Sequence, residues 1–199
     1  PVYEGGVFFP TALHTRNPKK ISDKIFNKCL ELGATFVRDD IKHIVHSKLK
    51  SDSQEYAFDQ LLIAAGAFSK QFTDQLGEDI PLETERGYHV HFKDSDKLIT
   101  RPICSFDSGV YLSPMDQGLR AAGTVEFGGL KNPPSPKRIE YITREAKKMI
   151  SNLPDPYDSW LGFRPTLPDF VPVIGESKNF QNVFYAFGHN HLGWTLGAI

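Results

Sequence analysis

The sequence has 199 residues, of which 40% are hydrophobic and 24% are charged, and its formal net charge is -1. These values are ordinary for a globular chain that can bury one large core or two small ones. The near-neutral charge argues against a nucleic-acid partner, and neither a membrane-spanning apolar run nor a signal-peptide pattern occurs. The only two cysteines, Cys29 and Cys104, favour a reduced, cytoplasmic protein.

The two ends of the sequence lack the usual features of a complete chain. It begins at Pro1 without a methionine, and it closes at Gly197-Ala198-Ile199 without a helix cap or stop signal. We therefore expect a fragment or an excised domain whose last residues lie within a helix.

The first predicted element is an amphipathic helix. Asn17 suits the N-cap, Pro18 suits the first helical position, and Gly33 suits the C-terminal cap. The apolar residues between them share one face at helical spacing: Ile21, Ile25, Cys29 and Leu32.

The next segments are predicted as short extended pieces. Residues 34–45 are extended, 48–53 form a polar turn, and 56–58 form a short strand. The apolar run 61–65 ends at Gly66, which is typical of a buried parallel strand.

The middle of the sequence favours an antiparallel sheet. Residues 86–92, 110–112 and 119–127 are strand candidates, and the last two are joined by a turn-rich segment, 113–118. A helix then starts at Ser135 and Pro136, with apolar residues at helical spacing, and Pro154 and Pro156 end it. Residues 182–187 form a strand that leads through 188–193 into a final helix.

Two stretches near the end of the sequence carry the candidate chemistry. In the first, GFRPTLPDFVPVIG over residues 162–175, closely spaced prolines hold Arg164 on a rigid backbone. A guanidinium held in this way suits a planar carboxylate, which accepts two parallel hydrogen bonds from it. Taken by its local sequence alone, Arg164 is better explained as a residue that pins its own loop.

The second stretch, YAFGHNHLGWT over residues 185–195, predicts a strand that ends at Gly188 and turns into a helix. Free backbone N–H groups at the start of such a helix favour a negatively charged or electron-rich ligand. By itself this pattern is equally typical of a plain strand-to-helix turn.

Together these stretches resemble the C-terminal signature of the D-amino-acid oxidase and dehydrogenase family of FAD enzymes. Upstream segments resemble the same family in the same order: Ala64-Ala65-Gly66-Ala67, Pro81-Leu82 followed by Arg86-Gly87-Tyr88, and Gly123-Thr124-x-Glu126. The resemblance covers nearly the whole chain. It implies an α/β fold with an α+β insertion, in which part of a Rossmann-like FAD-binding domain carries a mainly antiparallel substrate domain.

The resemblance also implies domain boundaries. Residues 17–79 and 164–199 would form the FAD-binding part, and residues 1–16 and 80–163 would form the substrate-binding domain. The family opens with a G-x-G-x-x-G phosphate-binding motif, which is absent from these 199 residues. The resemblance therefore implies a missing N-terminal part of the same chain, and we expect the isolated chain to bind FAD weakly and to be inactive.

By this resemblance, the reaction is oxidation of a carbon–nitrogen bond in an amino acid, with a hydride passing to the flavin and leaving an imine. Arg164 would bind the substrate carboxylate, and Tyr88 would line the substrate pocket. The cofactor-binding residues would be Ile41, Ala65, Gly66, Gly188, His189, Leu192, Gly193, Trp194 and Thr195. A D-amino acid is the expected substrate, and glycine, sarcosine or a proline-type imino acid is the alternative.

The electron acceptor implied by the resemblance is oxygen or a quinone, which allows peripheral association of the full enzyme with the inner membrane. Two readings from other classes stay open. The pairs His89/His91 and His189/His191 suggest a metal-dependent hydrolase, but neither pair has a third ligand at a suitable spacing. A non-catalytic binding domain is the other reading.

Overall fold

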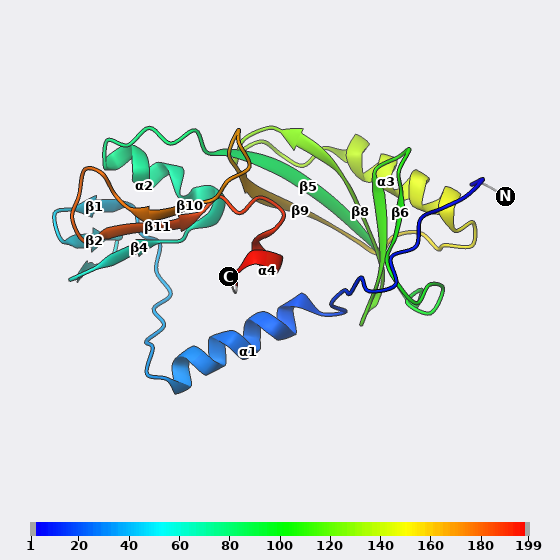
Figure 1. Cartoon of the computed structure of the whole chain (residues 1–199), viewed down its shortest axis with the longest axis horizontal. Helices are drawn as coiled ribbons and strands as arrows, with labels where there is room; N and C mark the ends of the chain where they lie inside the picture. Colours follow the sequence, from blue (N-terminus) through cyan, green and yellow to red (C-terminus); the bar gives the residue numbers. More distant parts are fainter. Residues whose placement is uncertain (1–2, 198–199) are drawn as a thin grey trace. The chain divides into compact units, whose positions relative to one another are not determined.

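The computed structural model describes residues 3–197, which form two compact units. Unit 1 contains residues up to Phe36 together with 87–125 and 133–162, and unit 2 contains residues 37–86, 126–132 and 163 onward. Each unit is therefore assembled from three separate stretches of the chain, and Figure 1 labels most of their elements. No helix within residues 3–197 is long and apolar enough to cross a membrane.

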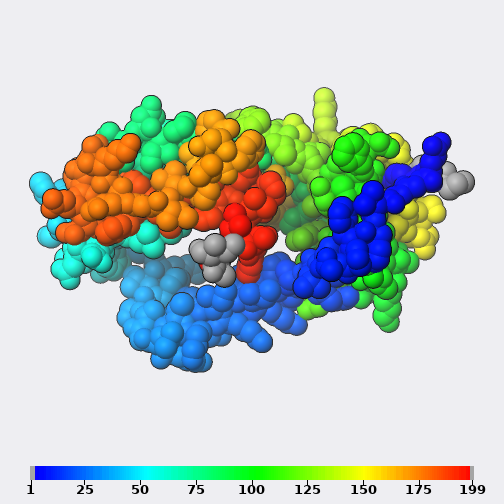
Figure 2. Space-filling model, in the orientation of Figure 1, coloured from blue at the N-terminus to red at the C-terminus, as the bar shows by residue number. Residues whose placement is uncertain are grey.

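Unit 1 begins with helix α1, Pro18–Glu31, whose N-terminal cap is the one that the sequence predicts, whereas Leu32 is the C-cap and Gly33, with a φ of 96°, follows it. The side chain of Asn17 accepts a hydrogen bond from the amide of Lys20 at 3.0 Å, and Pro18 occupies the first turn. Asp116 accepts hydrogen bonds from Asn17 and Lys20, which fix the start of the helix. None of the residues of α1 is buried, and Figure 2 shows this segment at the surface.

The main sheet has five strands in the order β6-β7-β8-β5-β9. The strands are β5 (Glu83–Phe92), β6 (Ile103–Ser105), β7 (Val110–Met115), β8 (Gly118–Phe127) and β9 (Asp158–Thr166). Helix α3, Pro136–Met149, packs on one face of the part of this sheet that belongs to unit 1 (Figure 1).

The core of unit 1 lies between α3 and this sheet. The side chains on its strands alternate between the two faces, as the pleat of a strand requires. Buried residues from three strands and α3 share this core, namely Tyr88, Val90, Phe92, Val110, Leu112, Leu119, Ala121, Ile142 and Ala146. The alternate residues of β5, His89 and His91, lie on the opposite face, which α3 does not cover.

The division between the two units falls inside three strands of the sheet. It separates Arg86 from Gly87 in β5, Val125 from Glu126 in β8, and Gly162 from Phe163 in β9. These strands therefore belong to both units, and the chain passes between the units at positions within regular structure.

Unit 2 contains two small sheets. The first has the order β1-β2-β3, formed by His43–Val45, Lys48–Lys50 and Glu55–Ala57. The second has the order β10-β11-β4, in which Val173–Glu176 pairs antiparallel and Leu61–Ile63 pairs parallel with Val183–Phe187.

The second sheet of unit 2 packs against the short helix α2 (Lys70–Gln75), which follows the 3-10 turn η1 (Gly66–Phe68). The buried residues of this core are Ile63, Phe72, Leu76, Leu82, Leu167, Val183, Tyr185 and Phe187. The mixed α/β architecture with mainly antiparallel sheets confirms the fold class that the sequence predicts.

Several local predictions were wrong. The polar segment starting at Lys48 is strand β2, because it pairs on both sides with β1 and β3. The expected long turn at 113–118 is short, since Ser113, Pro114 and Met115 belong to β7 and pair with β8. The first proline-rich signature begins inside β9, so Arg164 lies on a strand. The last two residues of the expected final helix, 198–199, lie outside the described residues.

The division into units can be compared with the domain boundaries implied by the resemblance. Helix α1 falls in unit 1 by its contacts, whereas the resemblance places residues 17–36 with the FAD-binding part. Which unit binds which ligand stays a prediction.

Candidate active site

The two signature stretches meet in unit 2 through Asn190. The amide of Asn190 donates a hydrogen bond to the carbonyl of Pro165 at 2.9 Å, and the hydroxyl of Thr166 donates to the Asn190 side-chain oxygen at 3.4 Å. Asn190 is 8% exposed and has a φ of 54°, a backbone region that asparagine tolerates better than most residues. The residue after Arg164 is thereby fastened to the turn that follows β11.

Arg164 lies on β9, which is an edge strand of the five-stranded sheet. Pro165 is tolerated in β9 because an edge strand need not donate a hydrogen bond at every position. The Nη1 atom of Arg164 is buried and has no hydrogen-bond partner among the described residues. A buried guanidinium N–H without a partner costs free energy unless a ligand accepts its hydrogen bond.

The turn from β11 into helix α4, Gly193–Leu196, is tightly built. Gly188 has a φ of 85°, and a Cβ atom at this position would lie 2.4 Å from Cδ1 of Leu167. The amide of Leu192 donates to the carbonyl of His189, and the amide of Thr195 donates to the carbonyl of Leu192, both at 2.9 Å.

Leu192 and Thr195, two of the four predicted cofactor-binding residues from 192 to 195, thus already use their amides within the turn. Within residues 3–197, the amides of Gly193 and Trp194 donate to no backbone carbonyl outside α4. The Trp194 side chain is 59% exposed.

The parallel strands β4 and β11 bring a second group of predicted residues to the same end of their sheet. Leu61 pairs with Val183 and Ile63 with Tyr185. Because the two strands are parallel, the segment after β4 and Gly188 after β11 leave the sheet at the same end. Ligands of open α/β sheets commonly bind at the carboxyl ends of parallel strands. Gly66 has a φ of 57° and open space where a Cβ would be, and it directly follows Ala65.

The serine after η1, Ser69, lacks the G-x-S-x-G pattern of a nucleophile in the sequence, and the structure shows a different feature of it. Ser69 is fully buried, and its hydroxyl has no hydrogen-bond partner among the described residues. It lies three residues after Gly66 and six after Ile63, the last residue of β4. The open glycine and the unsatisfied hydroxyl fit a polar group of a cofactor at the carboxyl end of this sheet.

The remaining predicted site residues lie elsewhere. Ile41 is partly buried and packs against the core of unit 2. Tyr88 belongs to unit 1, where it is 1% exposed and its hydroxyl accepts a hydrogen bond from the amide of Ser135 at 3.0 Å. The structure therefore joins the two residues that follow Arg164 to Asn190 of the 188–195 turn, and it places Tyr88 within the core of unit 1.

Two upstream motifs of the sequence meet in a buried ion pair. Arg86 is 1% exposed, and its Nε lies 3.4 Å from a carboxylate oxygen of Glu126. Its guanidinium also donates to the carbonyls of Gly128 at 3.4 Å and Asn132 at 3.0 Å. The motifs around Arg86 and Glu126 thus have a structural role in unit 2, which local sequence patterns did not indicate.

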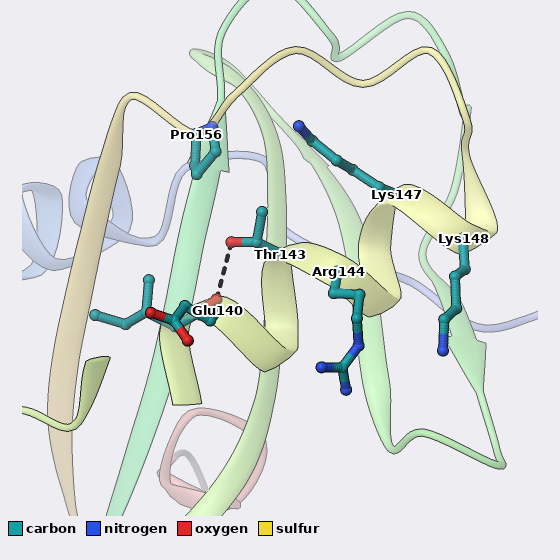
Figure 3. Close-up of a pocket in the computed structure, with 7 residues that line it drawn as sticks. Glu140, Thr143, Arg144, Lys147, Lys148 and Pro156 are labelled. Atoms are coloured by element: carbon teal, nitrogen blue, oxygen red, sulfur yellow. Dashed lines mark hydrogen bonds between the residues drawn. The ribbon is translucent and has the colours of Figure 1, made fainter. Parts of the chain in front are cut away.

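A groove of about 700 Å³ runs along α3 in unit 1. Figure 3 shows its polar side chains on the helix, with the Thr143 hydroxyl donating to the carbonyl of Ile139 at 2.8 Å. Its lysines are paired, Lys147 with Asp155 at 2.6 Å and Lys148 with Glu145 at 2.9 Å. The groove is an open surface with compensated charges, and it contains none of the predicted site residues.

The histidine pairs do not assemble a metal site in the described part of the chain. Among residues 3–197, no three His, Cys, Asp or Glu side chains lie close enough to hold a metal ion. The ring of His191 contacts the side-chain oxygen of Asn190 at 3.2 Å, so one member of the second pair supports the turn.

Comparisons with known proteins agree with the sequence resemblance. A family model described as FAD dependent oxidoreductase matches residues 1–199. A D-amino-acid oxidase of Bradyrhizobium diazoefficiens is 36% identical and aligns with 100% of this chain and 49% of its own length. A D-amino acid dehydrogenase of Neisseria gonorrhoeae is 28% identical over 96% of this chain and 48% of its own length.

Solved structures also share the fold. An L-proline dehydrogenase from P. horikoshii superimposes with a TM-score of 0.76 over 89% of this chain and 51% of its own, at 19% identity. The chain spans about half the length of the curated relatives it matches.

Proposed function

The chain belongs to the family of FAD dependent oxidoreductases, and from this premise we propose that its protein oxidises the carbon–nitrogen bond of an amino acid, with Arg164 binding the substrate carboxylate. The observation that carries the proposal is the buried Nη1 of Arg164, which has no partner among the described residues. A carboxylate would accept this hydrogen bond and neutralise the charge.

The fixed position of Arg164 supports a role in orienting the substrate. Its neighbours in sequence are held by the two hydrogen bonds to Asn190, and its strand belongs to the five-stranded sheet. An arginine on a rigid backbone can place a bound carboxylate, and hence the neighbouring α-carbon, in a constant orientation. The chemistry supplied by bound FAD is acceptance of the two electrons that leave the carbon–nitrogen bond.

The residues proposed to bind the cofactor are those at the carboxyl ends of β4 and β11 and in the following turn, with Ile41 as a further contact. Gly66 leaves room for the close approach of a ligand to the backbone, and the buried hydroxyl of Ser69 offers a donor nearby. Gly193 and Trp194 offer amides at the start of α4. Tyr88 remains the proposed wall of the substrate pocket, although its hydroxyl is already hydrogen-bonded.

The proposed substrate is a D-amino acid, because the relatives at 36% and 28% identity are a D-amino-acid oxidase and a D-amino acid dehydrogenase. Glycine, sarcosine or a proline-type imino acid is the alternative, since each presents the same carboxylate. We propose a cytoplasmic protein whose acceptor is oxygen or a quinone at the inner membrane.

The test uses the natural protein that contains this sequence. We would record its visible spectrum and add D- and L-amino acids without oxygen. Bleaching of the flavin bands by a D-amino acid is expected, and in Arg164→Ala the value of kcat/KM should fall about 10- to 150-fold, because one charge-assisted hydrogen bond contributes about 1.5–3 kcal/mol.

The matched control is Arg144→Ala, which removes the same side chain from the exposed surface of α3. Equal losses in both variants would refute a carboxylate-binding role for Arg164. A yellow protein that no amino acid bleaches would remove the substrate class. Oxygen uptake compared with reduction of a soluble quinone analogue identifies the acceptor, and titration of the 199-residue chain with FAD tests the expected weak binding.

A further inference from the structure

The stretch of unit 1 that contains α3 carries a local excess of positive charge. Residues 131–156 hold six of the 23 basic residues of the chain but three of its 24 acidic residues. The chain as a whole has a formal net charge of -1, so this stretch differs in sign from the remainder. A local excess of one charge attracts partners of the other charge, over a range that salt shortens.

The groove along α3 combines this charge with apolar surface. Its lining includes Ile139 and Pro156 together with Lys147 and Lys148, and its volume is about 700 Å³. Ile139 also packs against the core of unit 1, which fixes its position. Figure 3 shows the side chain of Lys147 extended toward Pro156. The aliphatic stems of lysines cover apolar surface while their ammonium groups remain in water, so the groove offers both kinds of contact.

The carboxylates that pair with the two lysines leave the ammonium groups accessible. Lys147 lies 2.6 Å from Asp155, whose side chain is 93% exposed. Lys148 lies 2.9 Å from Oε1 of Glu145, but Arg144 lies 3.0 Å from the same oxygen, so one carboxylate serves two cations. Exposed ion pairs contribute little to stability, so an incoming carboxylate can share or replace these partners.

The composition of α3 favours a peptide over a membrane as the partner of this surface. A helix that binds a bilayer turns its large apolar side chains toward the lipid. The large apolar residues of α3 are instead partly or fully buried, namely Ile139, Tyr141, Ile142 and Met149. A groove also suits a chain segment that lies along it. Helix α3 has 14 residues and is about 21 Å long, a distance that about six extended residues span.

We propose that this groove docks a short acidic segment of a partner protein in an extended conformation. Carboxylates of the segment pair with Lys147 and Lys148. An apolar side chain between them lies against Ile139 and Pro156. The site lies within unit 1 and requires neither bound flavin nor the carboxylate-binding role of Arg164, so this proposal and the proposed function can fail independently.

The test measures peptide binding by fluorescence anisotropy, with the natural protein that contains this sequence. The probe is a labelled hexapeptide, Glu-Leu-Glu-Glu-Leu-Glu, and its neutral analogue has Gln in place of each Glu. The acidic peptide should bind saturably at low salt and at least about tenfold more tightly than the analogue, because its carboxylates form charge-assisted hydrogen bonds. Raising the salt concentration from about 0.01 M to about 0.15 M should weaken the binding, since the Debye length falls from about 30 Å to about 8 Å.

A double variant locates the site on α3. Lys147→Gln combined with Lys148→Gln should weaken binding of the acidic peptide about tenfold or more. The matched control is Lys24→Gln combined with Lys28→Gln, which removes the same charge from the exposed helix α1 and should leave the binding unchanged. Thermal melts of the two double variants check that both are folded.

The proposal is overturned if the two peptides bind equally, if neither binds at low salt, or if both double variants bind the acidic peptide alike. Vesicles of equal parts phosphatidylglycerol and phosphatidylcholine test the other occupant. Vesicle binding that depends on Lys147 and Lys148, in a protein that does not bind the peptide, would assign the surface to a membrane. A mass in size-exclusion chromatography that depends on the same lysines, without peptide binding, would assign it to a second copy of the chain. Should the α3 variant fail to fold, the comparison of the two peptides on the original protein decides the question.

Discussion

Replacing Glu126 by glutamine tests whether the buried ion pair with Arg86 stabilises unit 2. The change keeps the shape of the side chain and removes its charge, while the guanidinium keeps its hydrogen bonds to the carbonyls of Gly128 and Asn132. Breaking a fully buried pair costs about 3–5 kcal/mol, whereas an exposed pair contributes about 1 kcal/mol or less.

The expected loss lies between these limits. The side chain of Arg86 is 1% exposed, but that of Glu126 is 22% exposed, so water screens one partner. We therefore expect Glu126→Gln to lower the free energy of unfolding by about 2–3 kcal/mol.

Urea unfolding followed by circular dichroism measures this loss. The control is Glu31→Gln in α1, whose partner Lys28 lies 3.0 Å away with both side chains 65% exposed, and here the loss should be about 0.5 kcal/mol or less. Equal, small losses in the two variants would refute the argument that burial makes the Arg86 pair important.

Three further predictions concern pH and the candidate site. The folded-state pKa of His89 is about 4 and thus below the unfolded value, so the chain should lose stability as the pH falls from about 6.5 to about 4. Thermal melts of His89→Asn should show a weaker dependence of Tm on pH over that range. A Tm that depends on pH equally in both proteins would contradict this. In Gly188→Ala the new Cβ would overlap Leu167, so the free energy of unfolding, measured in urea, should fall by about 1–3 kcal/mol. In Gly66→Ala the new Cβ meets no neighbouring atom, so the fall should be only the cost of the positive φ, about 1 kcal/mol. A larger loss in Gly66→Ala than in Gly188→Ala would argue against steric control. Asn190→Ala and Asn190→Gly both lose the side-chain hydrogen bond, but glycine adopts the φ of 54° without strain. The alanine variant should therefore lose more stability than the glycine variant. Equal losses would show that the lost hydrogen bond alone destabilises the protein.

The sequence predicted those elements whose signals are local. Asn17-Pro18 predicts the start of α1 and Ser135-Pro136 predicts the start of α3. Both are found in the sequence because the start of a helix depends on adjacent residues. The parallel strand β4 was visible as an apolar run that ends at Gly66. The resemblance to a known family then predicted the fold class, which the separate helices and strands did not define.

The elements that were missed depend on distant partners. Lys48–Lys50 becomes a strand only because β1 and β3 pair with it, and Pro165 lies in β9 because that strand is at the edge of its sheet. The link between Asn190 and Pro165 joins residues that are 25 positions apart in the sequence. The motifs around both residues were identified, but only the fold shows that they meet.

The positions at which the chain passes between its two units have a consequence for protein engineering. Passages occur after residues 36, 86, 125, 132 and 162, and three of these lie inside β-strands. Neither unit is a continuous stretch, so no single pair of chain ends can isolate one of them for expression. Transplanting unit 1 into a related protein would need five new junctions, three of them with the strand register preserved. Single substitutions within a unit are therefore the practical way to change its residues while the strand register stays intact.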